Sequence, residues 1–211
     1  MVFSKDRILV LAPHTDDGEF GCGGSIVKLV ENGSEVHYIA FSSCQASVPE
    51  GFPNDILIRE VKEATKVLGI EKNNLHILDY PVRRFAHYRQ EILEELVKYQ
   101  RELSPDILFM PSCNDLHQDH STVAMEGLRA FKQTTIFSYE IPWNNLNFST
   151  QGFIKFGETH MKTKLAALKK YKSQMHRPYA NEECIRGLAK ARGVSSGGRY
   201  AEAFEVVRLS L

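Results

Sequence analysis

The sequence predicts an α/β three-layer sandwich in which a mostly parallel sheet carries helices on both of its faces. Short apolar, β-rich segments alternate along the chain with segments of helical periodicity, a pattern typical of parallel sheets. Of the 211 residues, 43% are hydrophobic and 25% are charged, an ordinary composition for a globular domain. We therefore expect a Rossmann-like arrangement and a single domain over 1–211.

The first part of the chain shows the alternation clearly. Ile8–Ala12 is continuously apolar, as expected of a strand buried on both faces. Asn32-Gly33 is a helix C-terminal signal, and Gly69 ends a second helical pattern in the same way. The predicted elements are a strand over 7–12, a helix from the glycine run 21–24 to about 31, a strand over 35–41, a polar loop over 42–54 and a helix over 55–68.

The rest of the chain continues the pattern. The predicted elements are a strand over 75–78, a helix over 90–103, a strand over 106–110, a helix over 121–131, a strand over 135–141, a helix over 160–175 and a final strand over 203–209. The segment 143–157 is irregular, aromatic and rich in asparagine, so we expect it to line a cleft or to cap the core.

Composition excludes several classes of function. The 26 basic residues balance the 26 acidic ones, which argues against general capture of nucleic acid or of an anionic membrane. The four cysteines are scattered without a Cys-x-x-Cys pair, as in reduced proteins, so we expect a cytoplasmic location. We recognise no leader and no apolar run of about 18 residues, and we predict no membrane span.

Two polar clusters follow two of the predicted strands. His14-Thr15-Asp16-Asp17 comes directly after the first strand, and His117-Gln118-Asp119-His120 comes just past the strand 106–110. A single histidine or aspartate in such a place is more often a helix cap or a loop residue. Because the carboxyl ends of parallel strands meet at one edge of a sheet, the pair of clusters instead predicts a metal site.

The residue types in these clusters suit zinc chemistry. Catalytic zinc usually has three protein ligands and an open position for water, and His14, Asp17 and His120 supply a suitable set. Asp16 is then left beside the metal, where a carboxylate could act as general base. Iron(II) is also possible, since two histidines and a carboxylate hold Fe²⁺ in some oxygenases.

The remaining polar residues of the second cluster would assist the reaction. His117, as an imidazolium, could stabilise an oxyanion and protonate a leaving amine. Asp119 could orient that imidazole and stabilise its charge.

The glycine run 21–24 does not fit a dinucleotide-binding loop. Ile26 stands where a third glycine is required, and the acidic residues before the run would repel a pyrophosphate. We expect these glycines to let the first helix approach the sheet and the metal loop closely.

These motifs resemble the LmbE-like, or PIG-L, N-acetylglucosaminyl deacetylases. Members carry an (A/P)-H-x-D-D signature before a glycine-rich turn and a later H-x-D-H motif. The matching segments here are Pro13-His14-Thr15-Asp16-Asp17, Gly21–Gly24, Arg59-Glu60 with Ala64 and Leu68-Gly69, His117–His120, Ser173-Gln174, and Arg192-Gly193 with Tyr200–Phe204. The resemblance thus spans nearly the whole chain.

The resemblance implies roles for individual residues. His14, Asp17 and His120 would bind zinc, Asp16 would be the general base, and Arg59 would hold a substrate hydroxyl or phosphate. It also suggests a homo-oligomer. Many members have proline in place of Thr15 and glutamate in place of Gly18. Here the acid follows one position later, at Glu19, as in the bacillithiol-pathway branch.

The expected reaction is hydrolysis of the N-acetyl group of an N-acetylglucosamine-type sugar conjugate. The sequence leaves three alternatives open: an amidase acting on another acyl group, a metal-stabilised protein that binds amino sugars, and an Fe(II) oxygenase. We expect contacts to the aglycone from Arg83, Arg84 and the segment 143–156.

Overall fold

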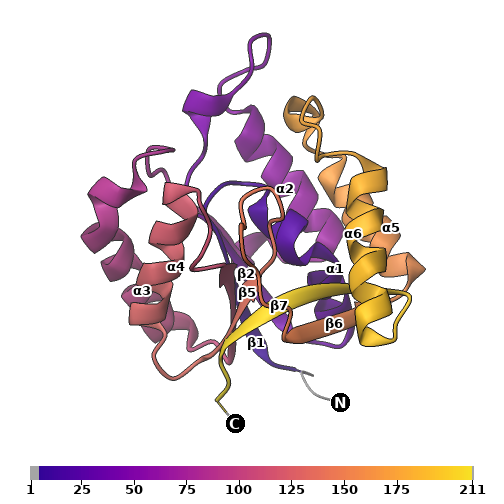
Figure 1. Cartoon of the computed structure of the whole chain (residues 1–211). Coiled ribbons are helices and arrows are strands. Elements are labelled where there is room, and N and C mark those ends of the chain that lie inside the picture. Colours follow the sequence, from indigo (N-terminus) through magenta and orange to yellow (C-terminus); the bar gives the residue numbers. More distant parts are fainter. Residues whose placement is uncertain (1–4, 211) are drawn as a thin grey trace.

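A seven-stranded sheet runs through the centre of the computed structural model, which describes residues 5–210 (Figure 1). The strands lie in the order β3-β2-β1-β4-β5-β7-β6. Their bounds are β1 Arg7–Ala12, β2 Glu35–Ala40, β3 Leu75–Ile77, β4 Ile107–Pro111, β5 Thr135–Tyr139, β6 Gly152–Phe156 and β7 Tyr200–Arg208. β3, β2, β1, β4 and β5 are parallel, whereas β7 pairs antiparallel with both β5 and β6. The predicted mostly parallel sheet is therefore confirmed.

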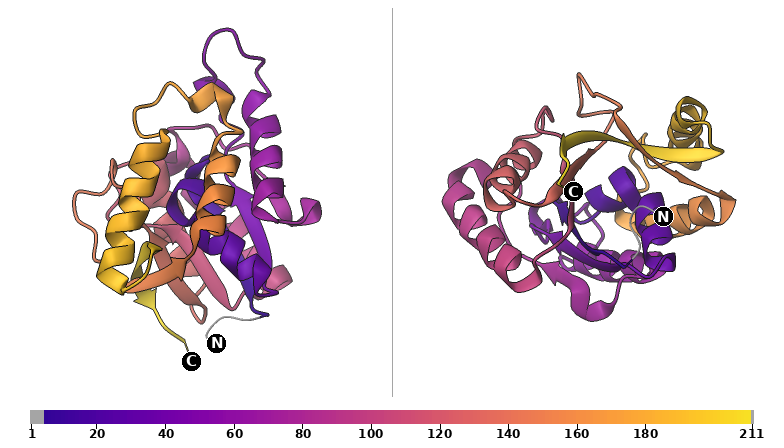
Figure 2. Two further views of the ribbon diagram at one scale, coloured as in Figure 1. Left: turned by 90° about the vertical axis from the view of Figure 1, so that its right-hand side faces the viewer. Right: turned by 90° about the horizontal axis from the view of Figure 1, so that it is seen from below.

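Helices cover both faces of this sheet (Figures 1 and 2). Their bounds are α1 Asp17–Glu31, α2 Ile56–Leu68, α3 Arg89–Leu103, α4 Gln118–Ala130, α5 Glu158–Leu168 and α6 Glu182–Ser196. Ile8 and Val10 of β1 belong to the core layer that contains Ile26 and Val61. Leu9 and Leu11 belong to the layer under α3 and α4. The predicted three layers follow from this alternation, and it explains why the strand is continuously apolar.

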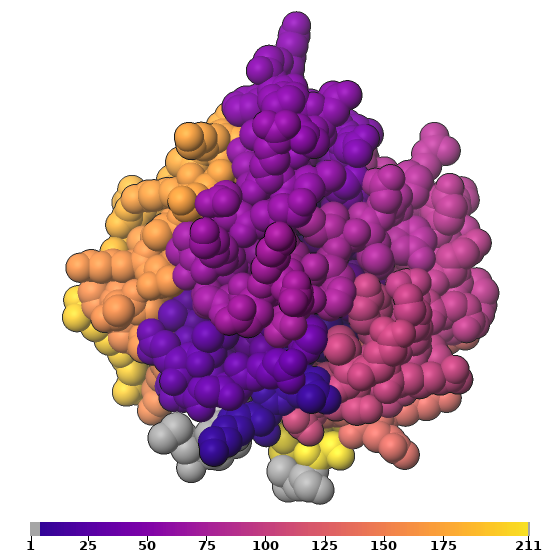
Figure 3. Space-filling model, turned by 180° about the vertical axis from the view of Figure 1, so that it is seen from behind, coloured from indigo at the N-terminus to yellow at the C-terminus, as the bar shows by residue number. Residues whose placement is uncertain are grey.

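The loop over 42–54, predicted from its polar composition, projects from one end of the molecule (Figures 1 and 3). It includes a short 3₁₀ turn, Gln45–Ser47, before α2 begins at Ile56. In the part of the chain that the structure describes, no helix has the length and hydropathy needed to cross a membrane.

The carboxyl-terminal third differs from the sequence prediction in two elements. The segment 143–157 contains strand β6, and α6 occupies a region that the prediction left without an element. The start of α6 has a local signal, because the side chain of Asn181 accepts a hydrogen bond from the Cys184 backbone N–H at 2.8 Å. Gly197, with φ of 69°, ends the helix.

Helix α5 ends at Leu168, earlier than the predicted 175, and a 3₁₀ turn follows at Lys172–Gln174. The early end brings Tyr171 back toward the first cluster. Its hydroxyl donates at 2.6 Å to the Thr15 carbonyl and lies 2.8 Å from a Glu19 carboxyl oxygen. Tyr38 contacts the same two residues from β2. These tyrosines fix the turn that leaves β1.

Glycines of α1 allow close packing, both in the run 21–24, where it was predicted, and at Gly18 before that run. A Cβ atom on Gly18 would lie 2.5 Å from the Tyr38 ring, and one on Gly21 would lie 2.3 Å from the Tyr139 ring. Both distances are shorter than side chains tolerate, so only glycine fits here. The first helix itself begins at Asp17, before the glycine run, and is kinked at Cys22.

A buried ion pair ties α5 and β7 to α1. Lys164 Nζ lies 2.6 Å from Glu202 Oε1, and the two side chains are 5% and 6% exposed. Glu202 also accepts the backbone N–H groups of Gly24 and Ser25 at 2.9 and 2.7 Å. The pair therefore positions the helix whose first residue is Asp17.

Candidate active site

A cavity of about 330 Å³ opens at the carboxyl ends of β1 and β4. We call it the polar pocket. Its lining comprises His14, Thr15, Asp16, Asp17, Cys44, Ser47, Leu57, Val82, Arg83, His117, His120, Trp143, Asn144, Gln174, Arg177 and Tyr179. Both predicted clusters thus reach one pocket, as expected for strand ends of a parallel sheet.

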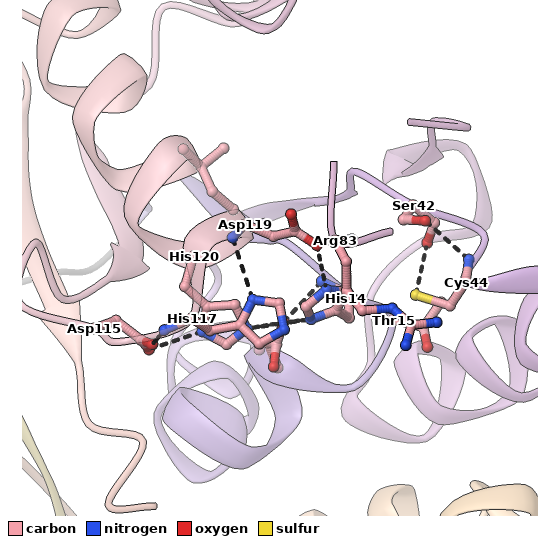
Figure 4. Close-up of polar contacts among 12 residues, drawn as sticks. His14, Thr15, Ser42, Cys44, Arg83, Asp115, His117, Asp119 and His120 are labelled. Carbon is pink, nitrogen blue, oxygen red and sulfur yellow. Dashed lines mark hydrogen bonds and ion pairs between the residues drawn. The ribbon is translucent and has the colours of Figure 1, made fainter. Parts of the chain in front are cut away.

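Three side-chain atoms from the two clusters converge inside this pocket. His14 Nδ1 lies 3.1 Å from Asp17 Oδ2, His120 Nε2 lies 3.1 Å from the same oxygen, and the two ring nitrogens are 3.2 Å apart. Figure 4 shows the two histidines facing each other. Three ligand atoms held about 2.0–2.2 Å from a tetrahedral zinc ion would be about 3.3–3.6 Å apart, slightly more than the spacing in this structure. We call His14 Nδ1, Asp17 Oδ2 and His120 Nε2 the triangle, and its spacing is close to that expected around such an ion.

The outer nitrogens of the two histidines are held by carboxylates. His14 Nε2 lies 3.1 Å from Asp119 Oδ2, and His120 Nδ1 lies 2.8 Å from Asp115 Oδ2. A carboxylate on the far nitrogen is the usual support of a metal-binding histidine, because it fixes the tautomer and the ring plane. The inner nitrogens, which lie 3.1 Å from Asp17 Oδ2, are then the ones left to bind a metal ion once they lose their protons.

His117 stands beside this triangle. One ligand atom each from His14, His117 and His120 lies within 4.8 Å of the others, so the three rings form a candidate metal group. The triangle that includes Asp17 is tighter. His117 therefore lies next to this triangle, outside its three closely spaced atoms.

Attraction between opposite charges shifts the pKa values of His14, His120 and Asp17. Burial lowers the pKa of both histidines, but the Asp17 carboxylate and the hydrogen bonds outweigh it, raising the pKa of His14 to about 8 and that of His120 to about 10. Burial opposes ionisation of Asp17, yet His120 and His14 hold its pKa well below the usual range. The three groups thus form a cluster of concentrated charge.

Asp16 lines the pocket without belonging to the triangle. Burial, and then the neighbouring Asp17 carboxylate, raise its pKa to about 6, while His14 and Arg177 act in the opposite direction. A carboxyl group with this pKa can both accept and release a proton near neutral pH.

His117 caps the amino terminus of α4, and its Nδ1 accepts the backbone N–H of Asp119 at 3.2 Å. Burial, together with the charges of His14 and His120, lowers the pKa of His117 to about 4. Both observations favour the neutral ring with its proton on Nε2. This differs from the imidazolium expected from the sequence, because the histidines that surround the ring disfavour a further positive charge.

The carboxylate of Asp119 contacts a different histidine from the one predicted. The sequence suggested that it orients His117, whereas the structure places it on His14, and only its backbone N–H reaches His117 (Figure 4). Its oxygens also accept the backbone N–H groups of Arg83 and Phe85 at 2.5 and 3.2 Å. Asp119 therefore joins the loop after β3 to the site.

Of the predicted contact residues, Arg83 lines the pocket, whereas Arg84 is exposed and lies outside the lining. Arg59 also lies away from the other predicted site residues. It lies on the exposed side of α2, outside the pocket lining, and its guanidinium is 2.7 Å from Asp55 Oδ2. Its role in substrate binding stays a prediction.

Sequence reasoning missed Asp115, which supports His120. It also missed Arg177 and Tyr179, which line the pocket from the segment before α6. Asp115 lies only two residues before the second motif, and that proximity was the available signal.

The sequence matches the PIG-L family, described as GlcNAc-PI de-N-acetylase, over residues 9–131, which is more than half of the chain. The chain belongs to this family. The uncharacterized deacetylase YaiS of Escherichia coli is 30% identical over 177 residues, which cover 80% of this chain and 92% of that protein.

Two further comparisons cover almost the whole chain. Diacetylchitobiose deacetylase of Thermococcus kodakarensis is 27% identical over 95% of this chain and 83% of its own length. The crystal structure of the conserved protein TT1542 from Thermus thermophilus has a TM-score of 0.80 and 25% identity, with 97% and 95% of the two chains covered. By family and by these relatives, the protein is a hydrolytic N-deacetylase.

Proposed function

We propose that the protein is a zinc-dependent hydrolase that removes the N-acetyl group from an N-acetylglucosamine-type sugar conjugate. The observation that carries the proposal is the triangle of His14 Nδ1, Asp17 Oδ2 and His120 Nε2, with sides of 3.1–3.2 Å. The acetylated amino-sugar substrates named for the family and for the Thermococcus relative support the substrate class.

His14, Asp17 and His120 would hold the metal ion. When bound, zinc supplies a Lewis acid that polarises the acetyl carbonyl and lowers the pKa of water. Asp119 and Asp115 fix the two imidazoles from behind, at 3.1 and 2.8 Å. Fe²⁺ fits the same donor types, and we propose zinc because the spacing suits tetrahedral ligands.

Asp16 is the proposed general base. It removes a proton from the attacking water, whose oxygen forms a bond to the acetyl carbon. The carbonyl π electrons move onto the carbonyl oxygen, and the Nε2–H of His117 donates a hydrogen bond to that oxygen as its charge develops.

Collapse of this tetrahedral species breaks the carbon–nitrogen bond. The electron pair of that bond goes to the sugar nitrogen, which takes the proton that Asp16 acquired in the first step. Acetic acid and the free amine result, and Asp16 returns to its carboxylate form; the acid then ionises to acetate and its proton passes through solvent to the amine. The balance thus needs one water and no other reactant.

We further infer a single domain working in the cytoplasm, and a homo-oligomer. Cys22 and Cys44 are buried free thiols, as expected of a protein from a reducing compartment. Gel filtration with light scattering would test the oligomeric state.

Acetate release tests the reaction directly. Zinc-loaded protein is assayed with a panel of N-acetylglucosamine conjugates, and Asp16→Asn is assayed beside it. We expect release by the parent protein and a loss of about 10²–10⁴-fold in Asp16→Asn at unchanged zinc content. Turnover by Asp16→Asn near the parent rate would show that the base is another group. No release from any conjugate, with zinc confirmed bound, would favour another acyl group or a binding protein.

A further inference from the structure

A second cavity, of about 360 Å³, lies beside the polar pocket. It runs between α6 and the turn after β5. Its walls include Phe20, Trp143, Tyr179, Leu188, Ala191 and Ala203. We call it the apolar groove. Its volume falls within the range of small-molecule sites.

An aromatic partition separates the two cavities. Trp143 and Tyr179 line both of them, and their rings stack at 3.9 Å with an angle of 9° between the planes. Phe20 meets both rings edge-on, at 5.3 and 5.6 Å. Trp143 remains 39% exposed. A ligand seated in the polar pocket therefore reaches the groove by passing over this partition.

The charged side chains that line the groove are paired with one another. Arg192 donates to Glu140 from Nε at 2.9 Å and makes a second hydrogen bond from Nη2. Lys164 and Glu202 form the buried pair described above. The surface left to a ligand is therefore aliphatic and aromatic, in contrast to the carboxylates and histidines of the polar pocket.

We propose that the apolar groove binds an apolar aglycone carried by the sugar substrate. The inference rests on the proposed function, because it takes the amino sugar to occupy the polar pocket. An acetyl group has two carbons and needs no second cavity of this size. The apolar group that fills the groove therefore belongs to the part of the substrate that keeps the amine. Continuity through Trp143 and Tyr179 supports a single ligand that spans both cavities.

Two glycosides that differ only in chain length test the proposal. The probes are the methyl and hexyl β-glycosides of N-acetylglucosamine, kept below micelle-forming concentrations. Binding is followed by tryptophan fluorescence, since Trp143 is the only tryptophan in the chain. Each fully buried methylene strengthens binding about fourfold, so we expect the hexyl glycoside to bind at least about tenfold more tightly even with partial burial.

Leu188→Gln and Val194→Gln provide a matched pair of variants. Both positions lie on α6, but Leu188 lines the groove, whereas Val194 is 72% exposed and lies outside the lining. We expect Leu188→Gln to lose most of the hexyl advantage and to bind the methyl glycoside as the parent does. Val194→Gln should keep the full advantage.

Equal affinity for the two glycosides would overturn the proposal. So would a Leu188→Gln variant that still binds the hexyl glycoside more tightly by the parent's factor. A third contrary result would be tighter binding produced by an N-hexanoyl chain on the methyl glycoside and not by the hexyl aglycone. Acetate release from the methyl glycoside is measured separately. If it is absent while the hexyl advantage still depends on Leu188, the groove assignment stands and the proposed reaction is wrong.

Discussion

The polar pocket and the apolar groove lie on either side of Trp143 and Tyr179, and they use their charged side chains in opposite ways. Behind the polar pocket, the carboxylates of Asp119 and Asp115 hold the outer nitrogens of His14 and His120, which leaves the inner nitrogens facing the pocket. In the wall of the groove, Glu202 instead pairs with Lys164 and accepts hydrogen bonds from backbone N–H groups. Charge in the pocket is thus arranged for a ligand, and charge beside the groove stabilises the fold.

Among the variants considered, His120→Ala should have the largest effect, and it acts on the polar pocket. Loss of one corner of the triangle is expected to abolish zinc retention and, with it, acetate release. Zinc content after dialysis, measured by mass spectrometry, provides the test. His87→Ala, at an exposed histidine outside the pocket lining, is the control. Zinc retained by His120→Ala at the parent level would remove His120 from the ligand set.

Lys164→Met tests the structural role of charge beside the groove. It leaves the Glu202 carboxylate buried without its cation, so we expect the free energy of unfolding to fall by about 3 kcal/mol. Urea denaturation measures the change. Lys162→Met, at an exposed lysine of the same helix, should cost far less. Equal losses in the two variants would contradict the stabilising role of the pair.

Asp115→Asn tests whether a carboxylate behind the polar pocket supports zinc binding through its hydrogen bond to His120. Because Asp115 holds His120 Nδ1 at 2.8 Å, we expect zinc affinity to fall about 10–100-fold while the protein stays folded. Competition with a chelating dye measures the affinity. Asp55→Asn, at a carboxylate that pairs with Arg59 on the surface, should leave it unchanged. A parent-like affinity in Asp115→Asn would exclude the supporting role.

Glu158→Gln should have the smallest effect. A hydrogen bond from Arg186 lowers the pKa of Glu158, so its contribution to stability is present above the ordinary glutamate pKa and is lost as the pH falls through the lowered value. The variant should therefore melt slightly below the parent at pH 7, and the gap should close toward pH 3. Thermal melts across this range test the prediction. A gap that widens in acid would contradict it.

The sequence was sufficient for the parallel core and for the two clusters. The segments that form β1 and β4 are apolar on both faces, and this local pattern predicts central parallel strands. Because such strands end at one edge of the sheet, the meeting of His14, Asp17 and His120 followed from their positions alone.

The tertiary structure decided which atoms support these residues and what lies beside them. Asp119 contacts His14 across 105 residues of sequence, and Tyr171 reaches Thr15 across 156. Local periodicity carries no information about such partners, since they depend on how loops and helix ends pack. The same reason applies to the apolar groove, which forms only where α6, β7 and the turn at Trp143 come together.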